Sequence, residues 1–232
     1  MSDLIKWPSH LVLVRHGQSE RNVAKMEAIA IGKKISYAAS MRDQDTPLTI
    51  NGFGQALHVG VELRKMDLFD VVFTSPYLRT MQTTESILKG IGGPRPKIVQ
   101  EERIREIEFG IMDGLTRDGM EAKYPEELVR RQKEGKYWYR PPAGESRPDV
   151  ALRLQSFLIT LSRDYSGQKV LVVTHSVVVL MFRKLLERWS EADYLKTDEI
   201  DDVQNCSITH YEANEINNKL VLTSYNSVCY PE

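Results

Sequence analysis

Three short and almost uninterrupted apolar runs recur along the chain, and they limit the folds that it can adopt. They are LVLV at 11–14, DVVFTS at 70–75 and KVLVVTH at 169–175. Short runs rich in β-branched residues are typical of strands in a sheet that is covered on both faces. A weaker strand is predicted at 97–99. Two further segments, 206–213 and 219–225, flank NEINN and predict a hairpin.

Helical patterns fall between these strands. Apolar residues recur at helical spacing over 56–63, in a helix starting near Asn51, over 150–161, and over 178–189. The second stripe follows Ser146 and Asp149, which have the spacing of a capping box. This alternation predicts an α/β protein, a three-layer α/β/α sandwich around a mostly parallel central sheet. Without repeats or low-complexity tracts, residues 1–232 are expected to form a single domain.

Composition excludes several classes of protein. The chain has 232 residues, of which 41% are hydrophobic and 27% charged, so it can bury a core without disulfides or metal. A net charge of −1 gives no overall attraction to nucleic acid or to an anionic membrane. Neither Cys206 nor Cys229 has a metal-binding spacing, and no signal peptide or membrane-spanning run is evident. We therefore expect a cytoplasmic protein, and its oligomeric state stays open.

Polar and cationic side chains follow the strands at the points where they end. Arg15 and His16 follow the first strand, and His175 follows the third. Arg79 lies in the first turn of the helix after the second strand, with Ser75 predicted as the cap of that helix. Because the carboxyl ends of parallel strands share one edge of a sheet, we expect these side chains to converge there. Arginines and helix N-termini favour an anion, so the sequence predicts an anion site at this edge.

Two long segments, 26–46 and 110–143, lie between the predicted elements. We interpret both as loops over the carboxyl ends of the strands, where α/β proteins place substrate contacts. The first carries Lys33, Lys34 and Arg42 among apolar residues, a mixture that suits either a second anion or an apolar group. The alternative is a solvated loop that does not contact the substrate.

Several motifs together resemble the histidine phosphatase superfamily, the phosphoglycerate mutase-like proteins. LVLVRHGQSERN is similar to its signature, SPYLRTMQT to its second-arginine segment and RIREIEFG to its acid segment. PPAGES, VLVVTHS and NCSITHYE match three more blocks, and all six come in family order. The resemblance covers roughly residues 10–212 and implies a phosphoglycerate mutase-like fold.

This resemblance implies a role for each residue of the predicted site. His16 would be the nucleophile that takes the phosphoryl group. Glu106 would be the proton donor to the leaving group and later the base for water. His175 would be the third catalytic residue, on the phosphate oxygens. The residues that would bind the substrate phosphate with it, or help to do so, are Arg15, Gly17, Ser19, Asn22 and Arg79. The resemblance implies no metal, and no other cofactor is expected.

The chemistry of these residue types agrees with such roles. Phosphoryl transfer needs positioning and charge neutralisation more than elaborate covalent machinery. A neutral imidazole is a competent nucleophile, and its unperturbed pKa is about 6.5. Neighbouring guanidinium groups should disfavour the protonated form of His16, which keeps it reactive near neutral pH. Gly17 removes a side chain where the backbone is expected to approach a ligand closely.

Two departures from the family pattern weigh against a glycolytic mutase. The mutases usually have a short Ser-Gly-Trp loop soon after the nucleophile, where this chain has the longer segment 26–46. They also carry paired arginines shortly before the double proline, and here that site is Tyr139-Arg140.

Residues 104–146 look more like the fructose-2,6-bisphosphatase domain, yet key cations differ. The lysine that this domain places just before Gly-Glu-Ser is Ala143 here. The glutamine and arginine that follow its second histidine are Ser176 and Leu180. These departures remove contacts to a second phosphate and exclude that substrate.

The sequence therefore predicts a phosphatase that hydrolyses a small phosphorylated metabolite through a phosphohistidine intermediate. It predicts no nucleic-acid or membrane partner. The first alternative is a cofactor-dependent phosphoglycerate mutase. The second is a non-catalytic module that binds a phosphorylated ligand, and the intact set of site residues argues against it.

Overall fold

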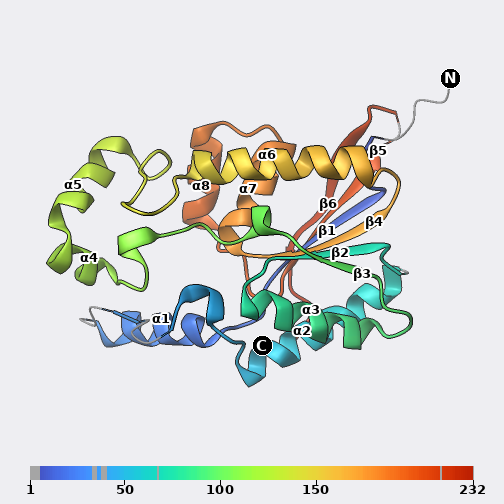
Figure 1. Ribbon diagram of the computed structural model, residues 1–232, viewed down its shortest axis with the longest axis horizontal. Coiled ribbons are helices and arrows are strands. Elements are labelled where there is room, and N and C mark those ends of the chain that lie inside the picture. The colour runs from blue at the N-terminus through green and yellow to red at the C-terminus, as the bar shows by residue number, and fades with distance from the viewer. Residues whose placement is uncertain (1–5, 33–35, 38–40, 67, 215, 232) are drawn as a thin grey trace.

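A six-stranded mixed sheet forms the centre of the protein (Figure 1). The computed structural model describes residues 6–32, 36–37, 41–66, 68–214 and 216–231. The strands are β1 (His10–Arg15), β2 (Val71–Thr74), β3 (Lys97–Gln100), β4 (Lys169–Thr174), β5 (Ile208–Asn214) and β6 (Lys219–Ser227). Their order across the sheet is β3-β2-β4-β1-β5-β6; the first four strands pair in parallel, and β5 pairs antiparallel with both β1 and β6. The predicted α/β class and the mostly parallel sheet are confirmed.

Alternating side chains of the central strands explain why helices cover both faces of the sheet. On β1, Leu11 and Leu13 pack into the core beside α6 (Arg147–Asp164) and α7 (Ser176–Leu186). The intervening Val12 and Val14 pack into a second core beside α2 (Ile50–Leu63) and α3 (Leu78–Ile91). Because successive residues of a strand point to opposite faces, a continuous apolar run requires two covering layers.

The helices lie on either side of the sheet in the view of Figure 1. Helices α6, α7 and α8 (Glu191–Ile200) lie above it, and α1 (Glu20–Ile31), α2 and α3 lie below. Short 3-10 turns lie at Asp43–Asp45, Arg64–Met66, Glu102–Ile104 and Gly110–Met112. The capping box at the start of α6 is present as predicted. Within the described ranges, no helix has the length and apolarity needed to cross a membrane.

The two long segments are more helical than the sequence suggested, and the prediction of loops was wrong there. Helix α1 takes in residues 26–31, and α4 (Arg117–Lys123) and α5 (Pro125–Glu134) occupy much of 110–143. The reason is that these helices bury almost nothing: Ala28 is the buried residue of α1, and α5 has none. A search for apolar stripes cannot find a helix without a buried face. Residues 33–35 and 38–40 of the first segment lie outside the described part of the chain.

One predicted helix also ends earlier than its apolar stripe. Helix α7 stops at Leu186, and Arg188 follows with a positive φ of 58°. Trp189 therefore lies beyond the helix, where its ring packs over the guanidinium of Arg183, 4.4 Å from its centroid. The apolar pattern therefore extended to Trp189, although the helix ended three residues before it.

Candidate active site

The carboxyl ends of β1, β2 and β4 bring the predicted residues to one edge of the sheet. The backbone N–H of His16 donates to the carbonyl of Thr174 at 2.9 Å. The N–H of Ser75 donates to the carbonyl of Val173 at 3.1 Å. These bonds extend the parallel ladders just past the strands, so that His16, Ser75 and His175 follow neighbouring strands at the same level. The convergence expected from the sequence is present.

Two neighbours determine the tautomer of the His16 ring. Its Nδ1 lies 2.8 Å from the carbonyl oxygen of Gly17, which can only accept, so Nδ1 carries the proton. On the other side, Nε of Arg79 donates to Nε2 of His16 at 3.2 Å. The neutral ring therefore presents its lone pair from Nε2 toward the arginine. In this tautomer Nε2, and not Nδ1, is the ring atom with a lone pair.

His16 is also held in its neutral form. Its ring is buried, with 4% of the residue exposed. Burial lowers the pKa of His16 well below 6.5, and the positive charges of Arg79 and Arg15 lower it further. A protonated ring would place a second positive charge directly against a guanidinium. The electrostatic expectation from the sequence thus has the same direction, with burial as its larger cause.

The second histidine, His175, is the N-cap residue of α7 and packs against the first. The ring centroids of His16 and His175 are 5.2 Å apart. Nδ1 of His175 lies 3.3 Å from Nη2 of Arg79 and accepts from it, so its Nε2 donates to the Ser75 hydroxyl at 2.8 Å. Burial, and then Arg79, lower the pKa of His175 well below 6.5. Both rings and the arginine form one cluster.

Ser75 has a different position from the predicted one. Helix α3 begins at Leu78, its N-cap residue is Tyr77, and no side chain caps it. The Ser75 hydroxyl faces His175 instead and accepts from its Nε2. The prediction that Ser75 caps α3 was wrong because the helix starts later, after Pro76 and Tyr77, which leaves the Ser75 hydroxyl outside its first turn.

Arg79 lies in the first turn of α3, where the sequence placed it, and it contacts a carboxylate that the sequence did not suggest. Its Nη1 lies 3.0 Å from Oδ1 of Asp43, and its Nη2 lies 3.1 Å from Oδ2. Nη1 also donates to the Asp43 carbonyl at 2.7 Å. The guanidinium lies over the ring of Tyr77, 4.9 Å from its centroid. Arg79 is thus fixed between two histidines, an aromatic face and one carboxylate.

Asp43 also contacts a second arginine, which pairs in turn with another carboxylate. Its Oδ1 also lies 3.2 Å from Nε of Arg21, and Arg21 pairs through Nη2 with Asp113. The ring of Tyr37 lies beside the Arg21 guanidinium, at 5.4 Å. Asp43 lies in no motif, and Arg21 lies within LVLVRHGQSERN but was assigned no role there. Their pairing joins the start of α1 to a residue 22 positions further along the chain, which a linear pattern does not record.

Arg15 is buried at the end of β1 with part of its hydrogen-bonding capacity unused. Its Nη1 donates to the carbonyl of Val203 and lies 3.9 Å from a carboxylate oxygen of Asp202. Its buried Nε has no hydrogen-bond partner among the described residues. A buried N–H donor without a partner costs free energy, so an anion that accepted this bond would be stabilised.

Glu106 is a buried carboxyl group, with 8% of the residue exposed. Its Oε1 accepts from the N–H of Ile107 at 3.0 Å. Burial raises the pKa of Glu106 above its ordinary value, which favours the protonated, donating form. Arg153 on α6 supports its backbone, since Nη2 donates to the Glu106 carbonyl at 3.2 Å. Although neighbouring residues are charged, the Glu106 carboxyl group is therefore buried and not part of a solvated surface.

The residues that follow His16 have structural roles in the turn before α1. A Cβ on Gly17 would lie 2.5 Å from the Gly52 carbonyl oxygen, so the close approach here is to the start of α2. Ser19 is the N-cap residue of α1, and its hydroxyl forms a capping box with Asn22. Oδ1 of Asn22 accepts from the Ser19 N–H at 3.0 Å and from its hydroxyl at 2.9 Å. The amide of Asn205, which sequence reasoning missed, donates to the His16 carbonyl at 2.9 Å.

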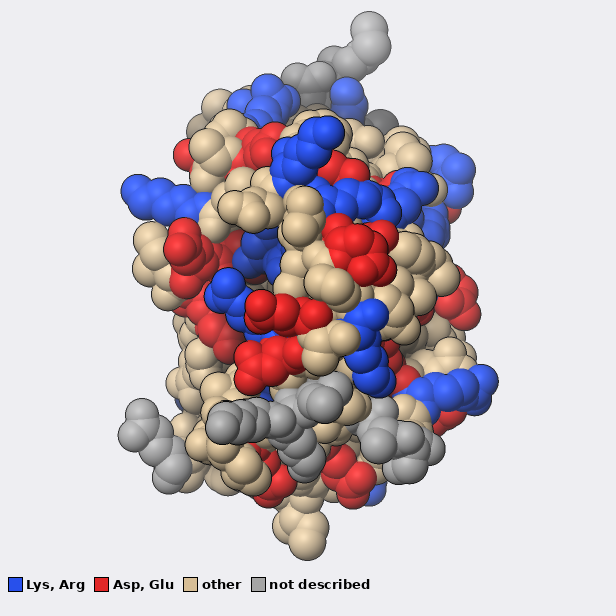
Figure 2. Space-filling model, turned by 90° about the vertical axis from the view of Figure 1, so that its left-hand side faces the viewer, with Lys and Arg blue, Asp and Glu red and all other residues tan. Residues whose placement is uncertain are grey.

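A cavity of about 1030 Å³ lies between α1 and the pair α4 and α5. Its walls mix apolar side chains with a few polar and charged ones, and Tyr37 and Ile29 are among them. Tyr37 links it to the site, because its ring lies on Arg21 and Arg21 contacts Asp43. Figure 2 shows the left-hand side of Figure 1, with basic and acidic side chains intermixed on this face.

Comparison with known proteins agrees with this geometry. Residues 11–226 match the sequence profile of the histidine phosphatase superfamily (branch 1). A 2,3-bisphosphoglycerate-dependent phosphoglycerate mutase of Methylobacterium radiotolerans is 34% identical over 185 residues, which cover 78% of this chain and 81% of that protein. The same enzyme of Rhizobium meliloti is 31% identical over 189 residues, which cover 80% and 83%.

Solved structures share the fold. The alpha-ribazole phosphatase of Shigella flexneri superposes with a TM-score of 0.72 at 20% identity, and the match covers 96% of this chain and 98% of that one. A mycobacterial glucosyl-3-phosphoglycerate phosphatase superposes with a TM-score of 0.69 at 24% identity, and the match covers 94% and 99%.

Proposed function

The chain belongs to the histidine phosphatase superfamily, and on that premise we propose that it hydrolyses a small phosphomonoester through a phosphohistidine on His16. The observation that carries the proposal is the state of the His16 ring. Its proton is held on Nδ1 by a carbonyl, and its Nε2 lone pair faces a buried arginine. A phosphoryl group bound to that arginine would meet the lone pair directly.

In the first step, Nε2 of His16 attacks phosphorus, and the bond from phosphorus to the leaving oxygen breaks. Protonated Glu106 gives its proton to that oxygen, and the product alcohol departs. Arg15, Arg79 and His175 neutralise the charge on the phosphoryl oxygens as it redistributes. The unpaired Nε of Arg15 supports this role, because it is a buried donor that an oxygen anion would satisfy.

In the second step, water attacks phosphorus and the bond to Nε2 breaks. Glu106, now a carboxylate, takes the proton from the water, and inorganic phosphate leaves. Glu106 returns to its protonated form and His16 to its neutral form, so the cycle closes without a redox partner or a metal. The raised pKa of Glu106 supports both halves of this role, since the group must give and regain a proton near neutral pH.

The residues after His16 would act through their backbone and through one another. Ser19 and Asn22 hold the start of α1, and Gly17 allows α2 to pack against the turn. In this proposal they keep the turn in position beside the phosphate, with Asn22 free to contact an oxygen through its side-chain N–H₂ group.

Hydrolysis is favoured over the mutase reaction because Arg21 and Arg140, which lie outside the His16 cluster, are paired with carboxylates. A mutase must hold a bisphosphate and a phosphorylated acid, and this needs cations beyond the first phosphate. Nε of Arg140 lies 2.7 Å from Oδ2 of Asp149 and is exposed, and Arg21 is paired with Asp43 and Asp113. Ala143 supplies no charge where a bisphosphatase has lysine. A substrate with one phosphate suits these surroundings.

A phosphoglycerate mutase is the second candidate, and one observation favours it. Relatives that are 31–34% identical over most of their length carry that name. The same residues around His16 would serve both reactions, because a mutase also passes through a phosphohistidine. The two differ in whether water or a second substrate takes the phosphoryl group.

Two assays on the purified protein test these alternatives. Phosphate release from p-nitrophenyl phosphate should be readily measurable and should not require 2,3-bisphosphoglycerate. Conversion of 3-phosphoglycerate to 2-phosphoglycerate should be slower than hydrolysis of the best of a panel of phosphorylated metabolites. Faster mutase turnover that depends on added bisphosphate would replace the proposal with the second candidate. Absence of both activities, with retained phosphate binding, would indicate a non-catalytic binding module.

A further inference from the structure

Two histidines and one glutamate that are remote in sequence meet at the start of β1. His10 is the first residue of β1, and His210 and Glu212 lie on β5. In the antiparallel pairing His10 lies opposite Glu212, and Val12 lies opposite His210. Residues directly opposite share a face, as do residues two apart on one strand. The register therefore places all three side chains on one face of the sheet, where β1 and β5 pair.

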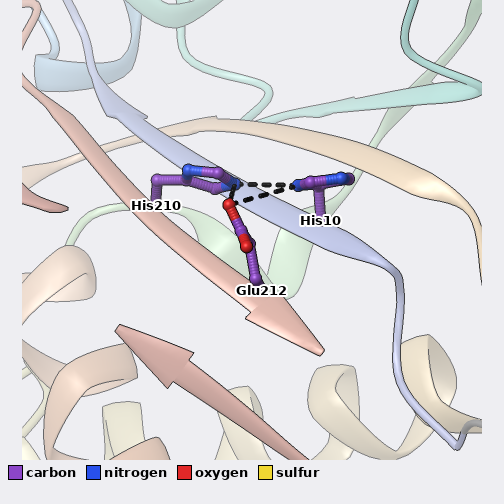
Figure 3. Close-up of side chains that lie close together, drawn as sticks. All are labelled: His10, His210 and Glu212. Atoms are coloured by element: carbon purple, nitrogen blue, oxygen red, sulfur yellow. Dashed lines mark hydrogen bonds and ion pairs between the residues drawn. The ribbon is translucent and has the colours of Figure 1, made fainter. Parts of the chain in front are cut away.

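Three possible ligand atoms of this group face one another (Figure 3). Nδ1 of His10 lies 3.1 Å from Nε2 of His210. Oε1 of Glu212 lies 4.0 Å from the first of these nitrogens and 3.9 Å from the second. A point equidistant from all three atoms lies about 2.2 Å from each, close to the bond lengths of zinc to imidazole nitrogen and carboxylate oxygen.

We propose that His10, His210 and Glu212 bind a divalent first-row transition metal of the zinc type. Two imidazoles and a carboxylate suit such a metal, whereas Mg²⁺ and Ca²⁺ prefer oxygen ligands alone. Binding requires a lone pair on both facing nitrogens. The ring that now donates across the 3.1 Å contact takes its other tautomer when the metal enters, so its proton moves to the outer nitrogen.

Access and local charge are compatible with an entering ion. The side chains of His10, His210 and Glu212 are 30%, 12% and 49% exposed, so the ion would rest on partly buried rings and complete its coordination with water. A cation, Lys169 on β4, lies opposite His10 in the strand pairing. Its Nζ donates to the Met66 carbonyl at 3.3 Å, so this ammonium has a partner of its own.

The site would join the parallel part of the sheet to its antiparallel edge, at a distance from the phosphoryl chemistry. Six residues of chain, from His10 to His16, separate the two sites along β1, or about 20 Å at the rise of a strand. A metal here would stabilise the pairing of β1 and β5 without contacting the substrate. Sequence patterns could not reveal it, because the two histidines are 200 positions apart.

Equilibrium dialysis of the untagged, metal-stripped protein against zinc chloride tests the proposal. Wild type should bind one equivalent of Zn²⁺ with a dissociation constant below about 10 µM. His10→Ala and Glu212→Gln should each weaken binding at least tenfold, because three protein ligands become two. His58→Ala, which removes an exposed histidine from α2, should bind like wild type. His16→Ala should also bind like wild type, because it alters only the phosphoryl site.

A melting curve supplies a readout that does not depend on activity. At zinc about a hundredfold above the dissociation constant, the Tm of wild type should rise by several degrees, and that of Glu212→Gln should not. Glu212 is half exposed, so its replacement leaves the fold intact even if the histidine variants fail to fold. Absence of saturable binding, or binding that survives both ligand substitutions, would overturn the proposal. Binding that is lost in His16→Ala would overturn it as well and would place the zinc in the other cluster.

Discussion

Asp43 holds the guanidinium of Arg79 with both carboxylate oxygens, at 3.0 Å and 3.1 Å. Nη1 and Nη2 of Arg79 are the atoms that would clamp a phosphoryl group, so an internal carboxylate occupies them in this structure. An arriving phosphate must displace the Asp43 side chain or share the arginine with it. Asp43 also contacts Arg21, so the carboxylate would keep an ion pair if a phosphate displaced it from Arg79.

We expect Asp43→Asn to bind phosphate more tightly. The substitution keeps the shape of the side chain and removes the negative charge that competes for Arg79. The inhibition constant of inorganic phosphate against p-nitrophenyl phosphate should fall by roughly tenfold, which corresponds to about 1.4 kcal/mol. Asp45→Asn is the matched control, since Asp45 lies two residues further on and pairs with the exposed Arg42. Weaker phosphate binding in Asp43→Asn would show that Asp43 orients Arg79 instead of competing for it.

Replacing His16 with Ala should abolish turnover. Loss of a covalent nucleophile costs on the order of 10⁴–10⁶ in kcat. The ring is buried at a strand end and bonded to Gly17, so circular dichroism and a melting curve must accompany the assay to establish that the variant is folded. His58→Ala, an exposed position on α2, is the control and should keep full activity. A folded His16→Ala variant with activity near wild type would refute the phosphohistidine mechanism.

His16 should stay neutral at pH values where an ordinary histidine is protonated. Its folded pKa lies well below 6.5, because of burial and then Arg79. Long-range ¹H–¹⁵N spectra should show the Nδ1–H tautomer at pH 6.5 and little protonation until the pH falls further. The same ring in the urea-unfolded protein should titrate near 6.5. A folded ring that titrates at or above 6.5 would contradict the electrostatic account.

The depressed pKa values of the two site histidines also predict how stability depends on pH. As the pH falls below 6.5, the unfolded chain takes up protons that folded His16 and His175 do not. The free energy of unfolding should therefore decrease with falling pH from 6.5 down to the folded pKa values. Urea denaturation of wild type and of His175→Gln at several pH values measures the contribution of one ring. Identical slopes in the two proteins would exclude His175 as a source of the effect.

Chelators should leave hydrolysis unchanged. In the proposed mechanism Arg15, Arg79 and His175 neutralise the phosphoryl oxygens, and the metal site proposed on β1 and β5 lies about 20 Å from His16. Phosphate release should be equal before and after exhaustive dialysis against EDTA, in wild type and in His10→Ala. Loss of activity that a divalent ion restores in both proteins would require a metal in the phosphoryl site.

The cavity beside α1 should bind the part of the substrate that does not react. Ile29 lines this cavity and is 66% exposed, so its replacement costs little stability. Ile29→Asn should lower kcat/KM for the best substrate of a metabolite panel severalfold and leave turnover of p-nitrophenyl phosphate almost unchanged. Ile31→Asn is the control, because Ile31 is similarly exposed at 71% and lies two positions on, toward the other side of the helix. Equal losses on both substrates would mean that Ile29 acts on the common site.

Much of the sheet could be predicted, and the reason lies in the central strands. Residues 11–14 and 170–173 are apolar without interruption because both of their faces are buried, and this pattern is local and strong. The helices of the two long segments escaped prediction for the opposite reason. Helix α5 has no buried residue, so no stripe marks it. The position of Ser75 was also misjudged, because its hydroxyl satisfies a histidine 100 positions away instead of its own helix.

Of the site, the sequence by itself determined which strand ends carry histidine and arginine, because each follows its own strand directly and parallel strands end at one edge. Only the tertiary structure decided the chemical state of these groups. The tautomer of His16 depends on Gly17 and on Arg79, 63 positions away, and its low pKa depends on burial under several elements. The pairing of Arg79 with Asp43, and the meeting of His10 with His210, likewise join segments that touch only after folding. Hydrogen bonds and Coulomb interactions act over a few ångströms of space, and separation along the chain does not measure that distance.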